Sequence, residues 1–345
     1  MKAVVVHGKD DLRVEEVPDP RCGPKDVLVR LEWGGICGSD ISYWKNGASG
    51  TAVLKDPLIL GHEVAGRIAE IGADVDRRTH DIHTGDAVTL HPATLVGDHT
   101  MPRAIADRTN LWPEVRYFGS AAFQPHEQGG FAEYRVVRPD QIRPLPSTVS
   151  TKAGALAEPL GVALHAVARA GDIDGRRVLV NGAGPIGVLC AAAAHAAGAA
   201  HVTVTDVADG PLAIARAMGA DAIVNVATGG ALPAEVDVTF EASGVPATLG
   251  PVIAATRRGG TLVQVGNLPG GEVSAVLGNI VTREIEFRGS YRFVDEITDA
   301  VAQMARGLDV RPLMTHEFDI DDAAEAFAVA ADRTSGSSKV MLKLS

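Results

Sequence analysis

The sequence predicts an α/β protein with a β-rich N-terminal region followed by a doubly wound parallel sheet. Three observations lead to this fold class. The first 145 residues consist of short apolar segments separated by turn residues. From about Ala153, Ala-rich helical stretches alternate with Val-rich strands, and a glycine-rich loop joins the first of these strands to its helix. A length of 345 residues suits two domains.

The expected elements follow the chain in order. In the β-rich region, turn residues such as the Asp-Pro pairs separate strands expected at 2–6, 27–31, 64–71, 87–90 and 131–137. In the second region, strands are expected at 177–180, 201–205, 237–240 and 261–265, with helices at 185–197 and 212–218. A last strand is expected at 338–343.

Composition and charge exclude several classes of partner. The net charge is −11, from 32 Lys and Arg against 43 Asp and Glu, without basic blocks. Nucleic acids and anionic membranes need clustered Lys and Arg, so neither is expected as a partner. Three cysteines cannot form a disulfide framework, which favours a reducing compartment. No secretory signal or membrane-spanning run is expected, and the predicted location is the cytoplasm.

The glycine-rich loop carries a dinucleotide-binding pattern. Gly182, Gly184 and Gly187 form G-x-G-x-x-G between the first Val-rich strand and a helix. In such loops the first glycine makes the tight turn, the second admits the pyrophosphate, and the third lets the helix pack on the strand. Asp206 ends the next strand, where a carboxylate accepts ribose hydroxyls and repels a 2′-phosphate. Residues 207–210 contain no Arg or Lys, so NAD is expected rather than NADP.

Two segments of the β-rich region contain candidate metal ligands. Cys37 lies in a glycine-rich stretch, and His62 and Glu63 follow Gly61. A thiolate, an imidazole and a carboxylate are ligand types that zinc takes, and a catalytic site needs three of them with one open position. For Cys37 or His62 alone, a buried thiol or a hydrogen-bonded loop histidine is the simpler interpretation. The wider sequence pattern favours the metal.

That wider pattern resembles the zinc-dependent medium-chain dehydrogenase/reductase superfamily. All fixed positions of its zinc signature are present, namely Gly61, His62, Glu63, Gly66, Gly72 and Val75. The resemblance continues through 85–88, 129–134, 157–160 and 240–244. Cys37 to Asp40 and Tyr43-Trp44 are similar to the polyol branch of sorbitol dehydrogenases. The stretches 116–120 with Pro125-His126, and 289–293, resemble L-idonate 5-dehydrogenases most.

The resemblance implies a domain organisation and a set of site residues. A GroES-like catalytic domain at 1–150, a Rossmann NAD-binding domain at 151–289 and a return to the catalytic domain at 290–345 are expected. Cys37 and His62 would ligate zinc, while Glu63 or Glu158 would be the third ligand or hold a zinc-bound water, and Ser39 would pass on the proton. Residues expected to line the substrate pocket are Tyr43, Phe118, Glu158, Arg292 and Phe293. Residues expected to contact NAD are Gly182, Gly184, Pro185, Ile186, Gly187, Asp206, Val265, Gly266, Asn267, Ser290 and Tyr291.

The sequence departs from the family at two places. Many relatives carry a lobe with four cysteines that binds a structural zinc, but residues 91–112 contain no cysteine. One catalytic zinc and no structural zinc are therefore expected. Ser42 stands where the family often has a proton-relay histidine. Proton exit would then use Ser39, the ribose hydroxyls and water, or another histidine such as His126.

These features together predict zinc- and NAD-dependent oxidation of a secondary alcohol on a sugar acid or polyol. An L-idonate 5-dehydrogenase that gives 5-ketogluconate is the first candidate. A dehydrogenase acting on sorbitol, xylitol, galactitol or threonine is the alternative, and a zinc-free NAD-binding protein without enzymatic activity is a third. The resemblance also implies a homo-oligomer, with a tetramer favoured over a dimer.

Overall fold

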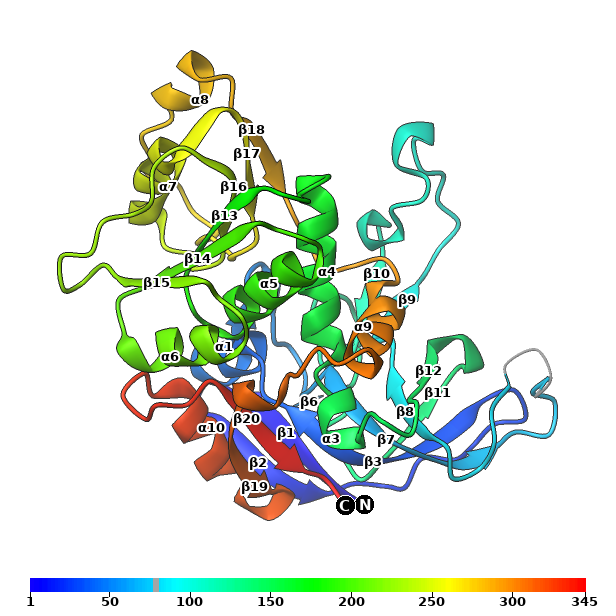
Figure 1. Cartoon of the computed structure of the whole chain (residues 1–345). Coiled ribbons are helices and arrows are strands. Elements are labelled where there is room, and N and C mark those ends of the chain that lie inside the picture. Colours follow the sequence, from blue (N-terminus) through cyan, green and yellow to red (C-terminus); the bar gives the residue numbers. More distant parts are fainter. Residues whose placement is uncertain (77–80) are drawn as a thin grey trace. The chain divides into compact units, whose positions relative to one another are not determined.

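The computed structural model describes residues 1–76 and 81–345, which divide into two compact units (Figure 1). The β-rich unit comprises Met1–Glu158, Ala300–Arg306 and Met314–Ser345. The parallel-sheet unit comprises Pro159–Asp299 and Gly307–Leu313. The division falls within the helix that contains Glu158, eight residues after the boundary expected at 150. The segment from 290 onward is shared between the two units rather than belonging wholly to the first.

The main sheet of the β-rich unit has seven strands. Its order is β12-β8-β7-β3-β20-β19, and β11 also pairs with β3. The long strands β3 and β7 run antiparallel at its centre, and the last strand of the chain, β20, pairs with β3. The bounds of these strands are β3 Val27–Gly35, β7 Glu63–Ile71, β8 Ala87–Leu90, β11 Tyr134–Val137, β12 Ile142–Pro144, β19 Met314–Asp319 and β20 Lys339–Lys343. Segments from both ends of the sequence therefore build one sheet.

Smaller sheets and short helices complete this unit. The strands form a β2-β1-β6 sheet and the pairs β4-β5 and β9-β10. Their bounds are β1 Lys2–Gly8, β2 Asp11–Glu16, β4 Ala48–Ser49, β5 Ala52–Val53, β6 Leu58–Ile59, β9 Ala93–Leu95 and β10 Val115–Tyr117. The helices are α1 Gly38–Asn46, α3 Thr151–Gly154 and α10 Ala323–Ala331, with 3-10 turns at Arg103–Ile105, Thr109–Leu111, Pro139–Gln141 and Ile320–Asp322.

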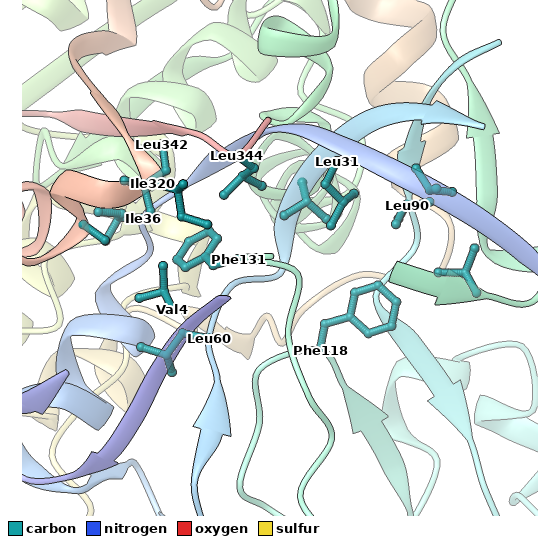
Figure 2. Close-up of a cluster of buried hydrophobic side chains, with 14 of the residues drawn as sticks. Val4, Leu31, Ile36, Leu60, Leu90, Phe118, Phe131, Ile320, Leu342 and Leu344 are labelled. Carbon is teal, nitrogen blue, oxygen red and sulfur yellow. The ribbon is translucent and has the colours of Figure 1, made fainter. Parts of the chain in front are cut away.

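One hydrophobic core joins these elements. Figure 2 shows Phe131 packed among side chains from both ends of the sequence, and farther along the cluster Leu90 and Phe118. Phe131 and Phe327 meet edge to face with ring centroids 6.3 Å apart. The labelled members of the cluster are Val4, Leu31, Ile36, Leu60, Leu90, Phe118, Phe131, Ile320, Leu342 and Leu344. The core therefore holds the ends of β3 and β7, where the candidate metal ligands lie.

The parallel-sheet unit contains six strands in the order β15-β14-β13-β16-β17-β18, all parallel. This order, 3-2-1-4-5-6 along the chain, is that of the Rossmann fold, with its switch point between β13 and β16. The strands are β13 Arg177–Asn181, β14 His201–Asp206, β15 Ala222–Asn225, β16 Val236–Glu241, β17 Thr256–Gln264 and β18 Glu286–Gly289. The predicted α/β fold class is confirmed.

Helices alternate with these strands. Helix α5 begins with Pro185 directly after the glycine loop and contacts β13 and β14, since proline suits the first helical turn. Gly182 has φ of +98°, and a Cβ there would lie 2.7 Å from the backbone nitrogen of Ser243, so the loop needs glycine at that position. The helices are α4 Ala157–Ala170, α5 Pro185–Ala196, α6 Asp209–Ala217, α7 Leu249–Ala255, α8 Gly278–Thr282 and α9 Glu296–Ala305, with 3-10 turns at Pro246–Thr248 and Arg311–Leu313. The division between the units passes through α9, after Asp299.

The structure corrects some expected elements. The strand expected at 131–137 begins only at Tyr134, because the backbone N–H groups of Gly129, Gly130 and Phe131 donate to residues 59–61 instead of to β3. Strands β15 and β18 had no clear periodicity in the sequence and were not expected. None of the helices in residues 1–76 and 81–345 has both the length and the apolar character needed to cross a bilayer.

Candidate functional site

Strand register brings three candidate metal ligands together. Gly35 at the end of β3 pairs with Glu63 at the start of β7. Cys37 follows β3 and is the N-cap residue of α1, with φ −98° and ψ 156°, while His62 directly precedes Glu63 in the chain. As a result, one ligand atom from each of Cys37, His62 and Glu63 lies within 4.8 Å of the other two. In the described part of the chain this is the one group of three or more such side chains so arranged.

The Glu63 carboxylate is buried and only half satisfied. The residue is 1% exposed, and its Oε2 atom has no hydrogen-bond partner among the described residues. A Cβ at the neighbouring Gly35 would collide with this oxygen, so glycine leaves it room. An unpartnered buried carboxylate oxygen is costly unless a cation or donor meets it. Beside a thiol and an imidazole, this atom fits a third zinc ligand.

Asp40 joins the two ligand-bearing segments. It is fully buried, and its Oδ2 accepts the backbone N–H of Cys37 at 2.9 Å while its Oδ1 accepts that of Gly61 at 3.1 Å. Oδ1 also lies 3.9 Å from Nδ1 of His62. Burial raises the pKa of Asp40, against the opposite influence of His62. No role was predicted for Asp40 from the sequence, although an acidic side chain three residues after Cys37 is typical of helix capping.

A buried lysine lies on the other side of the cluster. Lys339, at the start of β20, is 2% exposed, and its Nζ donates to Glu63 Oε1 at 2.7 Å and to the Ile36 carbonyl at 3.1 Å. Burial alone would lower the pKa of Lys339, but Glu63 and Cys37 raise it above its ordinary value. Lys339 was not among the residues predicted from the sequence. The one sign of it in the sequence is a lysine near the start of the apolar strand expected at 338–343.

Glu158 lies in the same unit but outside the three-residue cluster. Its Oε1 accepts the hydroxyl of Tyr117 at 2.6 Å, and burial raises its pKa despite the nearby His62. Burial would lower the pKa of His62, but Cys37, Asp40 and Glu158 outweigh it and raise that pKa well above its ordinary value. The site therefore surrounds His62 with acidic groups, whose ionised forms favour a bound cation.

The residues expected around the substrate occupy different environments. Ser39 lies in the first turn of α1, and its hydroxyl makes no hydrogen bond within the part of the chain described. Tyr43 is buried, and its hydroxyl oxygen accepts the backbone N–H of Ala121 at 2.9 Å, which leaves its own proton for another acceptor. Phe118 is buried in the core beneath the Arg135 guanidinium, 3.6 Å from the ring centroid.

The other two expected substrate residues belong to the parallel-sheet unit. Arg292 and Phe293 follow β18, and Arg292 has φ of +51° with its guanidinium 4.9 Å from the Tyr291 ring centroid. The next helix begins at Glu296, which accepts a ring N–H from His165 at 2.7 Å and the backbone N–H of Val294. Burial would raise the pKa of Glu296, but His165 and the backbone donors lower it. The buried His165 thus links α4 to the start of α9.

The expected dinucleotide residues gather at the carboxyl ends of the parallel strands. Asp206 ends β14, and its Oδ2 accepts the backbone N–H of Ala183 within the glycine loop at 2.7 Å. Its Oδ1 accepts the N–H groups of Val207 and Ala208. Ser290 follows β18, and its hydroxyl is buried with no partner among the described residues. In a Rossmann fold, dinucleotides bind at this edge of the sheet.

Aromatic and backbone contacts connect parts of the segment 91–112, which contains no cysteine. The Trp112 indole donates to the Val96 carbonyl at 2.8 Å, and the Trp112 and His99 rings meet edge to face with centroids 5.6 Å apart. Strands β9 and β10 pair beside them. Aromatic packing and backbone pairing therefore contribute to the structure of this region.

Comparison with known proteins identifies both units. A family model described as "Alcohol dehydrogenase GroES-like domain" matches residues 23–147, and one described as "Zinc-binding dehydrogenase" matches residues 185–306. The chain is 36% identical to L-idonate 5-dehydrogenase (NAD(P)(+)) of Escherichia coli strain K12, over 89% of each chain. It is 38% identical to sorbitol dehydrogenase of Gallus gallus, over 99% of this chain and 96% of that one.

Solved structures agree with these matches. The crystal structure of L-idonate 5-dehydrogenase from Escherichia coli superposes with a TM-score of 0.90 at 36% identity, covering 99% of this chain and 97% of the other. The family predicted from the sequence is thereby confirmed. The chain belongs to the zinc-dependent medium-chain dehydrogenase/reductase superfamily, in its polyol branch, and is an oxidoreductase acting on CH–OH groups.

Proposed function

We propose that this protein oxidises a secondary alcohol of a sugar acid or polyol with NAD, and that its substrate is L-idonate, which gives 5-ketogluconate. The observation that carries the zinc-dependent part is the buried cluster of Cys37, His62 and Glu63, with its unpartnered Glu63 Oε2. The relatives named L-idonate 5-dehydrogenase and sorbitol dehydrogenase support the substrate class.

In this proposal Cys37, His62 and Glu63 hold one zinc ion. Glu63 is favoured over Glu158 because Glu63 belongs to the 4.8 Å cluster, whereas Glu158 is engaged by Tyr117. Zinc, when bound, supplies Lewis-acid polarisation of a coordinated oxygen. Glu158 then stands beside the cluster as an acceptor for a substrate hydroxyl or a water.

The chain's own residues orient the substrate and move the proton. Ser39 accepts the alcohol proton and passes it outward, while Tyr43 has a hydroxyl proton to donate to a substrate oxygen. NAD, when bound, would be the two-electron oxidant, so that the alcohol carbon would lose a hydride while Ser39 takes the hydroxyl proton. His126 does not suit the proton route, because its Nε2 accepts the backbone N–H groups of Lys55 and Asp56 and its Nδ1 pairs with the Phe123 carbonyl.

NAD is the proposed cofactor, and Asp206 is the reason. Its carboxylate sits at the end of β14, fixed by Ala183, where it accepts ribose hydroxyls and repels a 2′-phosphate. Residues 207–210 offer no cation to a phosphate. The Escherichia coli relative is named for both NAD and NADP, so the preference needs its own measurement.

A panel of substrates and cofactors tests this function. Initial rates with L-idonate, gluconate, sorbitol, xylitol, galactitol and threonine are measured with NAD and with NADP, and kcat/KM is compared. L-idonate with NAD is expected to give the highest value. A higher kcat/KM for sorbitol, xylitol or threonine would select the alternative substrate, and a lower KM for NADP would refute the cofactor. No oxidation of any of these by a zinc-loaded protein would favour a binding role.

One zinc ion per chain is expected. The single cluster in the described residues has three protein ligands, and residues 91–112 lack the thiolates of a structural site. Metal analysis of protein dialysed against metal-free buffer checks the ratio. Two tightly held zinc ions per chain would contradict the expectation, and loss of the one ion to a chelator should leave the fold of residues 91–112 intact.

A homo-oligomer, a tetramer rather than a dimer, is also proposed. Among the described strands, β18 pairs only with β17 and so forms an open edge of the parallel sheet. Phe287 on this strand is exposed, as are Val276, Leu277 and Val281 in the segment that precedes it in the chain. Open edges and exposed apolar side chains favour association with another chain. Light scattering in solution measures the mass, and a monomer would contradict the proposal.

The cytoplasm is the proposed location, since a Cys37 thiolate needs reducing surroundings.

A further inference from the structure

A line of polar side chains crosses the carboxyl ends of four adjacent parallel strands. Thr205 directly precedes Asp206, the last residue of β14, and its hydroxyl donates to Asn181 Oδ1 at 2.9 Å. The Asn181 amide on β13 donates to Glu241 Oε1 on β16 at 3.1 Å, and the Gln264 amide on β17 donates to Glu241 Oε2 at 2.7 Å. We call these four residues, Thr205, Asn181, Glu241 and Gln264, the polar belt.

Glu241 is the centre of the polar belt. Its side chain is fully buried, and every group that meets its two oxygens is a donor. Besides Asn181 and Gln264, Oε1 accepts from the backbone N–H of Ser243 at 3.0 Å and from the hydroxyls of Ser243 and Thr248, while Oε2 accepts the N–H of Gly244 at 3.2 Å. A carboxylate only accepts hydrogen bonds, so no amide can replace it without placing a donor against donors.

These bonds tie together segments that the sequence analysis expects around NAD. Asn181 directly precedes Gly182, and the Asn181 carbonyl accepts the N–H of Ala242 at 2.8 Å. The Glu241 carbonyl accepts the N–H groups of Val265 and Gly266 at 2.9 and 2.8 Å. The second proton of the Gln264 amide goes to the Gly266 carbonyl at 2.7 Å. The three turns after β13, β16 and β17 are thus held to one carboxylate.

Hydrogen bonds connect the polar belt to two further segments. The Gln264 carbonyl accepts the backbone N–H of Ser290 at 3.0 Å, after β18. On the other side, Thr205 holds the end of β14, from which the Asp206 carboxylate reaches Ala183. Glu241 lies on β16, next to β13, so it is at the switch point where a Rossmann sheet receives its ligand.

We propose that Glu241 is a positioning residue for the dinucleotide. From beneath the site it fixes the relative placement of the Gly182, Ser243–Gly244 and Val265–Asn267 turns, and through Gln264 that of Ser290, without itself touching the cofactor. The inference rests on the proposed use of NAD. A buried network in which every donor is satisfied holds its members rigidly, and a site held rigid before binding loses less entropy when the ligand arrives.

Glu241→Gln is the test. In either orientation of the new amide, its NH2 group faces donors, from Asn181 and Ser243 on one side or from Gly244 and Gln264 on the other. The dissociation constants of NAD and NADH, measured on the full zinc-loaded chain by calorimetry and NADH fluorescence, are expected to rise about tenfold. The melting temperature is recorded alongside.

Thr239→Val is the matched control. Thr239 lies two residues earlier on β16, is fully buried, and shares a 2.8 Å hydrogen bond with Thr256, away from the glycine turns. The control should lower the melting temperature while the dissociation constant of NAD stays within about twofold. If Glu241→Gln lowers the melting temperature as the control does and leaves NAD binding equally unchanged, Glu241 only stabilises the fold and the inference is wrong.

Gln264→Met keeps the test decisive if Glu241→Gln does not fold. This variant leaves Glu241 in place and removes the Gln264 amide that connects Glu241 Oε2 to the Gly266 carbonyl. NAD binding should weaken several-fold, and unchanged binding would overturn the inference. The unaltered protein separates this inference from the proposed function. If the unaltered protein binds neither NAD nor NADH, the proposed cofactor is wrong, and so is the proposed role of Glu241. If it binds both, the variants alone test the role of Glu241.

Discussion

Replacing Cys37 with alanine is expected to abolish turnover and zinc binding while leaving NAD binding intact. Cys37 offers the only thiol in the three-residue cluster, and two remaining ligands hold zinc poorly. Loss of the metal removes several kcal/mol of charge stabilisation, so kcat/KM should fall by about a thousandfold or more. His62→Ala should behave in the same way. Initial rates, metal content and NADH titration measure the three quantities.

Cys22→Ala is the matched control for this change. Cys22 lies in the same unit but outside the three-residue cluster, and its thiol lies 3.6 Å from the Gly23 carbonyl oxygen and 3.5 Å from that of Asp26. The control should keep its zinc and its rate. Substantial activity in a Cys37→Ala protein shown to be free of metal would refute the zinc-dependent function, and loss of NAD binding in that variant would mean that the substitution disturbs more than the metal site.

Replacing Lys339 with methionine is expected to destabilise the metal-free protein strongly. Among the described residues, the only ion pair of the buried Glu63 carboxylate is the one with Lys339. Breaking a buried ion pair by removing one partner costs about 3–5 kcal/mol, because the other charge stays buried and unpaired. Zinc supplies positive charge to the same carboxylate, so the zinc-loaded variant should lose less stability than the metal-free one. Denaturant unfolding with and without a chelator measures both.

Lys343→Met provides the comparison on the same strand. The Lys343 side chain is about half exposed, and its ammonium lies 3.9 Å from the Asp319 carboxylate. Exposed ion pairs of this kind contribute about 0–1 kcal/mol to the free energy of unfolding. Lys339→Arg should retain most of the stability because it keeps the charge. A metal-free Lys339→Met protein as stable as the Lys343→Met protein would show that Glu63 is satisfied in some other way.

Much of the parallel-sheet unit could be predicted from the sequence, because its signals are local. The run before Gly182, the glycine spacing and Asp206 lie within one strand-loop-helix-strand segment, and each carries a periodicity or a turn preference that neighbours set. Strands β15 and β18 at the two edges were missed. Edge strands are half-buried, so their residues need not follow the apolar pattern of central strands. In the β-rich unit, the strand expected at 131–137 was too long because Gly129 to Phe131 bond to a distant segment.

The candidate metal site shows a similar division. His62 and Glu63 were noticed because a motif of fixed spacing contains them, and Cys37 because it lies in a glycine-rich stretch that resembles the polyol branch. The choice between Glu63 and Glu158 stayed open. Lys339 was not predicted, because it lies 276 positions from Glu63 in the chain and no local sequence pattern indicates their contact. Asp40 was noticed only as part of a motif, because its hydrogen bond to Gly61 depends on how α1 packs.

By itself, the sequence determined the fold class, the superfamily and the residue types available for zinc and a dinucleotide, because short-range patterns encode strands, helices and glycine turns. Only the tertiary structure decided which carboxylate joins Cys37 and His62 within 4.8 Å, which lysine opposes it, and that Glu241 ties four strand ends together. Those relations depend on strand register and burial. A buried charge takes its partner from whatever the fold brings within a few ångströms, and that partner is seldom a neighbour in the chain.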